Sequence, residues 1–266
     1  MSISKPVNKK SVKMLCLGNS CLKWPILLVL VWTIDNVSQA QAVFLSQDLP
    51  RRKVVVLDPG HGGHDLGAVG PSGLAEKVVA LLVAHKIKEV LSEICEVHLT
   101  RNDDYRVDII DRTAVANHYR ADIFLSIHAG GGFRRQGLGV VVFYHSSDTG
   151  RIASMPAGQQ KGPWGIRAKP LPWNYIQGRH TAKTQVLAKF VHRHLTAKLG
   201  SEDTVDGGIR EAPCLVLRGA DMPAVLVEIG HLSHPADEKE LRKSKVISDV
   251  AQAISEAIKE YFSRYP

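Results

Sequence analysis

The stretch KVVVLDPGHGG, residues 53–63, indicates the class of fold. Residues 53–58 are a short run of β-branched and apolar side chains, which predicts a buried strand that ends as a glycine-rich loop begins. Further strands are predicted at 94–100, 122–128, 139–144, 224–228 and, more weakly, 214–217. Helical spacing of apolar residues covers 75–93, 107–119, 181–199 and 244–262. This alternation predicts one α/β domain at 53–264, with a largely parallel sheet covered by helices on both faces.

The segment 145–180 interrupts this alternation. It holds four prolines and two tryptophans, together with several glycines. A loop of this length in a compact domain is usually functional. Two interpretations stay open: the segment borders the active-site cleft, or it is a tolerated surface insertion.

Residues 1–42 have the order of a secretory signal: a basic start, an apolar run and small residues. Five lysines precede the 11 apolar residues 24–34, and Ser38, Ala40 and Ala42 follow at cleavage-site spacing. The run is shorter than the roughly 20 residues that span a bilayer. We expect a protein exported to the periplasm or cell envelope, with 1–42 either cleaved as a signal peptide or retained as a membrane anchor.

The composition is that of a globular protein, with 44% hydrophobic and 23% charged residues. The net charge is +8, and the five lysines and single acid of the leader account for half of it. The remaining +4 gives little support for nucleic-acid binding, so we expect no nucleic-acid partner. Only Cys95 and Cys214 remain beyond the leader, and their pairing stays open.

Residues that can bind a metal follow the predicted strands. His61, His128 and Glu228 lie at three strand ends, where parallel sheets bind ligands. The glycine-rich loop 60–73 can fold Glu76 back beside His61. Two imidazoles and a carboxylate form a common catalytic zinc set. We therefore expect Zn²⁺ held by His61, Glu76 and His128, with Glu228 as the general base.

Other motifs are absent, and one alternative ligand remains. The glycines do not form a dinucleotide fingerprint, because Asp65 stands where its third glycine belongs, and no GxxxxGK[ST] occurs. Neither HExxH nor GxSxG is present, which argues against thermolysin-type proteases and α/β-hydrolase serines. His64 also has chelating spacing to His61, at i+3.

The order of motifs resembles the zinc-dependent N-acetylmuramoyl-L-alanine amidases that cleave bacterial peptidoglycan. The resemblance covers about 53–262. Its blocks are VLDPGHGG with Gly67-Ala68, then Glu76-Lys77, then LTRxxD with Arg112 and Ala116-Asn117, then ADIFLSIHA at 121–129, then PAVLVEIG at 223–230.

The resemblance implies the same zinc ligands, Glu228 as the catalytic glutamate, and a single α/β domain with a mixed sheet of about six strands. It implies hydrolysis of the amide between N-acetylmuramic acid and L-alanine. This chain has Gly130 where the family has asparagine, and GHLSH in place of GFLSN at 230–234. His231 and His234 therefore tune substrate contacts, add a metal ligand or are tolerated replacements. Arg112 and His64 are further candidates for orienting ligands or contacting substrate.

We expect a monomer whose substrate is peptidoglycan. No separate cell-wall-binding domain is recognisable, so targeting is expected to come from an envelope activator protein, the leader or the basic surface. Two other functions remain: an amidohydrolase of the same fold that acts on free muropeptides or another amide, and a non-catalytic glycan-binding module.

Overall fold

The computed structural model describes residues 51–130, 139–145, 173–200 and 207–266. Residues 52–266 form one compact unit. The leader expected at 1–42 lies outside the described residues, as does most of the segment 145–180. The elements are β1 (Lys53–Pro59), α2 (Glu76–Leu91), β2 (Cys95–Leu99), α3 (Ile109–His118), β3 (Ile123–His128), β4 (Val141–His145), η1 (Trp173–His180), α5 (Thr181–Leu199), β5 (Gly208–Ala212), η2 (Leu215–Leu217), β6 (Ala224–Glu228), α6 (Pro235–Leu241) and α7 (Ser244–Arg264).

The strands form one mixed six-stranded sheet in the order β2-β1-β3-β6-β4-β5. The four strands β2, β1, β3 and β6 are parallel, and β4 runs antiparallel to β6. Pro59 of β1 pairs with Ile127 of β3, and His128 of β3 pairs with Glu228 of β6. The carboxyl ends of β1, β3 and β6 therefore meet at one edge. The predicted α/β domain with a mixed, mostly parallel sheet is confirmed.

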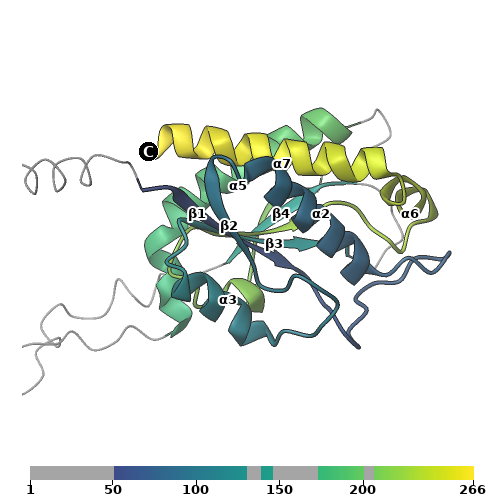
Figure 1. Ribbon diagram of the computed structural model, residues 1–266, viewed down its shortest axis with the longest axis horizontal. Coiled ribbons are helices and arrows are strands. Elements are labelled where there is room, and N and C mark those ends of the chain that lie inside the picture. Colours follow the sequence, from purple (N-terminus) through teal and green to yellow (C-terminus); the bar gives the residue numbers. More distant parts are fainter. Residues whose placement is uncertain (1–50, 131–138, 146–172, 201–206) are drawn as a thin grey trace, which may run out of the picture. The chain divides into compact units, whose positions relative to one another are not determined.

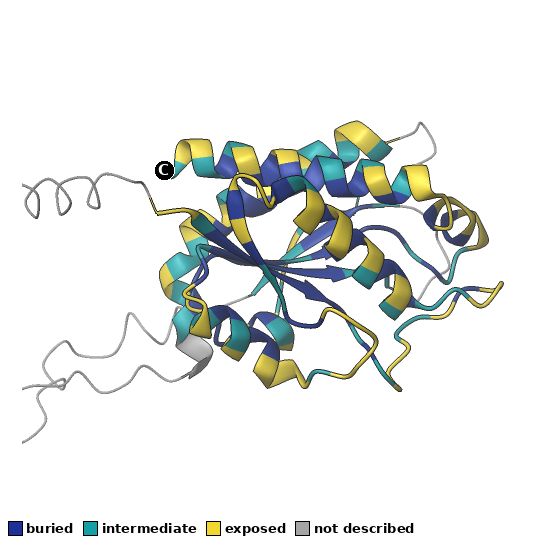
Figure 2. Cartoon of the chain, in the orientation of Figure 1, coloured by how far each residue is buried: buried dark blue, intermediate teal, exposed yellow. Residues whose placement is uncertain are grey.

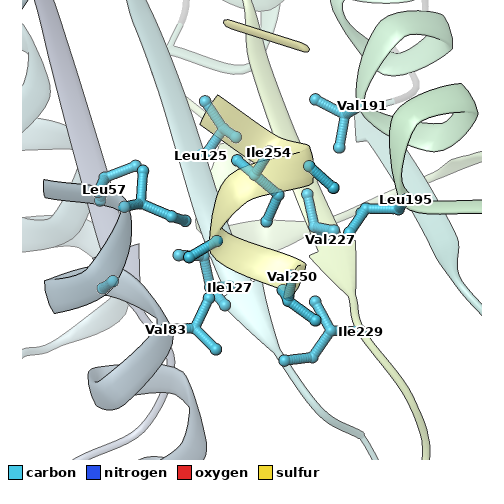
Figure 3. Close-up of a cluster of buried hydrophobic side chains, with 14 of the residues drawn as sticks. Leu57, Val83, Leu125, Ile127, Val191, Leu195, Val227, Ile229, Val250 and Ile254 are labelled. Carbon is cyan, nitrogen blue, oxygen red and sulfur yellow. The ribbon is translucent and has the colours of Figure 1, made fainter. Parts of the chain in front are cut away.

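Helices cover both faces of the sheet. α7 packs against both α2 and α5 over one face, while α3 and η2 cover the other (Figure 1). The central strands are buried on both sides (Figure 2), which is why they appear in the sequence as continuous apolar runs. In the larger core, Leu57, Leu125 and Val227 of the sheet face Val83 of α2 and Ile254 of α7 (Figure 3).

One predicted strand is wrong, and two short elements of the structure are not predicted. The weak strand predicted at 214–217 is wrong: the chain turns there, with Leu217 N–H donating to Cys214 O at 3.2 Å, and buries Leu217 against α3. The sixth strand is instead β5, an edge strand without a buried apolar run. Helix α6 was not predicted, although Pro235 at its first turn is a recognised start signal.

The two cysteines beyond the leader are free thiols. Cys95 lies in the edge strand β2, and Cys214 precedes η2 near the opposite edge of the sheet. The pairing that the sequence left open is therefore not formed. Burial raises the pKa of the Cys214 thiol to about 11, with a further contribution from the charge of Glu228. Among the helices in the described residues, none has the length and apolar character to cross a membrane.

Candidate metal centre

The loop that follows β1 places His61 at the edge of the sheet where the carboxyl ends of β1, β3 and β6 meet. His61 has a left-handed backbone conformation, with φ 62°, which is uncommon for a residue with a side chain. Two buried arginines hold this turn by its carbonyls. Arg101 donates to Pro59 O at 3.0 Å and to Gly60 O at 2.8 Å. Arg112 donates to His61 O at 2.9 Å. These bonds impose the strained conformation, as is typical of functional sites.

Glu76, at the start of α2, lies between two imidazoles. His61 Nε2 is 3.1 Å from Glu76 Oε2, and His128 Nδ1 is 2.8 Å from Oε1. One donor atom from each of these three residues lies within 4.8 Å of the others. We call His61, Glu76 and His128 the ligand group. Ligands about 2.1 Å from a tetrahedral zinc ion are roughly 3.4 Å apart. The three donors therefore have about the spacing that a single ion requires.

The carboxylate of Glu76 is stabilised in its ionised form. Burial opposes ionisation, but hydrogen bonds and charge from His128 and His61 outweigh it and hold the pKa well below its usual range. Backbone N–H groups of Ala68 and Ala129 donate to the carboxylate at 2.8 and 3.0 Å. A buried, ionised carboxylate of this kind is suited to binding a cation.

Asp65 orients the first histidine. Its Oδ2 lies 3.0 Å from His61 Nδ1. When Nδ1 donates to this carboxylate, the lone pair of the ring is on Nε2, the atom that faces Glu76. Burial lowers the pKa of His61, but Glu76 and Asp65 outweigh burial and raise it. Gly67, with φ 65°, passes so close that a Cβ there would lie 2.6 Å from Glu76 Oε2 and from His61 Cδ2. The absence of a side chain at Gly67 thus lets the backbone approach both residues.

Glu228 lies on the strand next to His128, at the same level of the sheet. Gly130 N–H donates to Glu228 Oε2 at 2.5 Å, and a Cβ on Gly130 would lie 2.8 Å from that oxygen. Burial raises the pKa of Glu228, and the charge of Glu76 adds to this effect, while His128, the Gly130 N–H and His231 oppose it. A carboxylate with a raised pKa beside a ligand group is suited to proton transfer.

The other predicted histidines lie outside the ligand group. Among the described residues, only His61, Glu76 and His128 come together in such a group. His64 is exposed, and its Nε2 is 2.9 Å from Arg106 Nη1. The alternative in which His64 chelates is therefore not met by this geometry.

His231 and His234 lie beyond Glu228, on the segment that leads into α6. The backbone N–H of His231 donates to Asp237 Oδ2 at 2.9 Å, and its imidazole is near enough to lower the pKa of Glu228. His234 Nδ1 is 3.5 Å from Asp237 Oδ1. Neither histidine joins the ligand group. His231 is therefore a neighbour of the Glu228 carboxylate, and His234 a neighbour of Asp237 in α6.

Arg112 braces the metal-site loop from inside the protein. Its side chain is 6% exposed and donates to Asp58 Oδ1, whose side chain is 0% exposed, at 2.8 Å. The same guanidinium donates to Pro59 O, His61 O and Val107 O. Of the two roles considered for Arg112, orientation of a ligand fits this burial, and contact with substrate does not.

The sequence interpretation did not identify several supporting residues. Asp65 orients His61, and Arg101 holds the loop carbonyls. Asp58 accepts from Thr100 Oγ1 at 2.5 Å and Ser126 Oγ at 2.6 Å. An acid that closes an apolar strand and an arginine that follows one are signals for such buried polar networks, because both need partners when buried.

Comparison with known proteins identifies a family. Residues 55–260 match the N-acetylmuramoyl-L-alanine amidase family. The chain is 33% identical over 223 residues to N-acetylmuramoyl-L-alanine amidase AmiC of Neisseria meningitidis, an alignment that covers 80% of this chain. The chain spans about half of that relative, 53% of its length.

Solved structures have the same fold. Amidase AmiC2 of Nostoc punctiforme is 28% identical with a TM-score of 0.62, covering 79% of this chain and 97% of that one. The CwlD amidase of Clostridioides difficile, solved in complex with the GerS lipoprotein, is 23% identical with a TM-score of 0.61, covering 80% and 99%. The chain therefore belongs to the N-acetylmuramoyl-L-alanine amidase family.

Proposed function

We propose that this protein is a zinc-dependent hydrolase of the amide bond between N-acetylmuramic acid and L-alanine in peptidoglycan. The observation that carries the proposal is the convergence of one donor atom each from His61, Glu76 and His128 within 4.8 Å, with Glu228 on the strand beside His128. Family membership supplies the reaction and the substrate class.

The donor set suits zinc. Two imidazole nitrogens and one carboxylate oxygen leave a fourth tetrahedral position for water or substrate. Asp65 on His61 and the backbone N–H groups on Glu76 are the outer contacts that orient ligands in zinc sites. A bound zinc ion would polarise the substrate carbonyl and acidify water.

Proton transfer is assigned to Glu228. Gly130 N–H holds Oε2, so Oε1 is the oxygen that exchanges protons. In this mechanism Glu228 takes a proton from the attacking water and later gives it to the nitrogen of L-alanine. The raised pKa supports both steps, because the group must accept a proton and then release it.

We also propose that the protein acts outside the cytoplasm as a monomer. Residues 1–42 have the pattern of an export signal or anchor, and peptidoglycan lies in the envelope. We further propose that another protein of the envelope activates this enzyme. The complex of the CwlD amidase with GerS shows that a protein of this fold can bind a lipoprotein.

Metal loading tests the proposal. We expect residues 43–266 to bind one zinc ion and to solubilise purified peptidoglycan. A chelator should abolish activity, and stoichiometric zinc should restore it. His128→Ala should lose both zinc and activity, and the matched control His64→Ala should keep zinc, because His64 lies outside the ligand group.

Other outcomes point to the alternatives. Zinc binding with hydrolysis of free muropeptides, but no release from intact wall, would favour an amidohydrolase of the same fold. Wall binding that Glu228→Ala leaves unchanged, without hydrolysis by either protein, would favour a non-catalytic glycan-binding module.

A further inference from the structure

Helix α6 carries two consecutive buried carboxylates. Asp237 and Glu238 are 3% and 2% exposed, although both belong to a short helix at the protein surface. Burying a carboxylate is unfavourable unless it is paired or hydrogen-bonded. Their partners therefore explain why α6 holds two buried acids.

Glu238 binds the loop that precedes α2. Its Oε2 accepts from Ser72 N at 2.8 Å and its Oε1 from Leu74 N at 3.0 Å. Arg242 donates to Oε1 at 2.9 Å and to Ser72 O at 2.7 Å. Burial opposes ionisation, but hydrogen bonds from the Leu74 and Ser72 N–H groups and from the Arg242 side chain outweigh it and lower the pKa of Glu238 to about 2. Both oxygens are thus committed to donors.

The backbone of this loop is shaped to meet Glu238. A Cβ on Gly70 would lie 2.3 Å from Glu238 Cδ, so the carboxyl group packs directly on the glycine. Gly70 N–H donates to Leu74 O at 2.9 Å, which closes the turn. The loop then enters α2, where Glu76 N–H donates to Ala68 O at 2.8 Å. The turn held by Glu238 therefore ends two residues before a metal-ligand candidate.

Asp237 binds a different segment, the chain that leaves β6. Its Oδ2 accepts from His231 N at 2.9 Å, three residues beyond Glu228. Gly230, with φ 150°, faces the same carboxylate: a Cβ there would lie 3.6 Å from Oδ2. The other oxygen, Oδ1, has no hydrogen-bond partner among the described residues and lies 3.5 Å from His234 Nδ1. Only one oxygen of Asp237 is therefore committed.

We propose that α6 is a clamp that sets the separation between Glu76 and Glu228, with Glu238 positioning the first and Asp237 the second. Ser72 and Glu238 are 166 residues apart in sequence, so this contact links the loop before α2 directly to α6. The inference rests on the proposed function. Both acids are positioning residues, because neither belongs to the ligand group.

The hydrogen bonds predict opposite responses to amide substitution. In Glu238→Gln, the amide NH₂ must face either Ser72 N–H or the donors Leu74 N–H and Arg242, so a donor meets a donor in each orientation. In Asp237→Asn, the carbonyl can keep the bond to His231 N–H while the NH₂ turns towards His234 Nδ1. Glu238→Gln should therefore release the turn at 72–74. Asp237→Asn should keep most of the kcat that Asp237→Ala loses.

The experiment measures zinc affinity by chelator competition and kcat and KM on a defined muropeptide. We expect Glu238→Gln to weaken zinc binding on the order of tenfold, as for other residues that orient metal ligands. Asp237→Ala should lower kcat with KM and zinc affinity little changed. Glu240→Gln is the matched control on the same helix, because Glu240 is exposed and pairs only with Lys243 among the described residues.

A control variant shows whether a general loss of stability changes zinc affinity or kcat. Val54→Ala removes packing from the smaller core, which holds no residue of α6, of 70–76 or of 229–232, and should leave zinc affinity unchanged at a temperature where the protein is folded. Hydrogen exchange of the apo protein gives a readout that is independent of activity. The Ser72 and Leu74 amides should exchange faster in Glu238→Gln, and the His231 amide faster in Asp237→Ala but not in Asp237→Asn.

The outcomes separate this inference from the proposed function. Wild-type protein that binds no zinc and releases no stem peptide would overturn the proposed function, while exchange still tests the contacts of α6. If Glu238→Gln has the zinc affinity of the wild type and the same rates of amide exchange at Ser72 and Leu74, the proposal that α6 is a clamp is wrong. Equal kcat in Asp237→Asn and Asp237→Ala would overturn the part assigned to Asp237.

Discussion

Replacing Arg112 by lysine tests whether this residue braces the His61 turn. Arginine donates to Asp58, Pro59 O, His61 O and Val107 O, at distances from 2.8 to 3.2 Å. A lysine keeps the charge beside Asp58 but has a single nitrogen, so it cannot also reach His61 O and Val107 O.

The expected loss follows from these contacts. A hydrogen bond from a charged donor contributes roughly 1.5–3 kcal/mol, so Arg112→Lys should lower the free energy of unfolding of the apo protein by about 2–4 kcal/mol. Arg112→Met should lower it by about 3–5 kcal/mol, because Asp58 would keep a buried charge without its partner. Zinc affinity should fall roughly 10- to 100-fold in Arg112→Lys, since the His61 carbonyl is released.

Urea unfolding of the apo protein and chelator competition measure the two effects. Arg106→Lys is the control: Arg106 is 55% exposed and pairs with Asp108 at 3.0 Å, so its replacement should change stability by less than about 1 kcal/mol. If Arg112→Lys has the stability and zinc affinity of the wild type but a raised KM for peptidoglycan, Arg112 is a substrate contact and not a brace.

Three further predictions concern the catalytic carboxylate, acid stability and the thiols. Glu228→Gln should keep zinc, because the amide oxygen still accepts from Gly130 N–H, while kcat falls about 10²- to 10⁴-fold; loss of zinc would show that Glu228 is a ligand. The pKa of Glu238 is about 2 when folded and near 4.5 ordinarily, so its stabilisation is present above pH 4.5 and lost as pH falls towards 2. The difference in unfolding free energy between wild type and Glu238→Gln should therefore shrink over this range, and a constant difference would argue against the assignment. When residues 43–266 are unfolded without a reductant, an alkylating reagent should label two thiols, Cys95 and Cys214. An unlabelled protein whose mass is two hydrogens below that of the reduced chain would instead indicate a disulfide.

The buried strands and long helices were predictable because tertiary burial reinforces their local pattern. β1 is apolar throughout since both of its faces are covered, and α5 has the predicted bounds, Thr181–Leu199. The short elements β5 and α6 bury few apolar side chains, so they carry weak periodicity. Only the proline and the acids at the start of α6 mark it in the sequence.

The metal-ligand candidates were also predictable, because parallel strands align their carboxyl ends. The supporting residues were not, since their roles depend on contacts between distant segments. Arg112 reaches His61 O across 51 residues, and its sequence position does not distinguish a brace from a substrate contact. Asp65 is only four residues from His61, but its role depends on the turn closed by the bonds between Gly62 and Asp65.

Product analysis by mass spectrometry shows which bond of peptidoglycan the protein hydrolyses. A muropeptide of known structure is incubated with zinc-loaded residues 43–266 and, in parallel, with Glu228→Gln. We expect two products from the wild-type protein only: a glycan with an intact lactyl group and a free stem peptide with an L-alanine amino terminus. Cleavage between the sugars or within the stem peptide would contradict the proposed function.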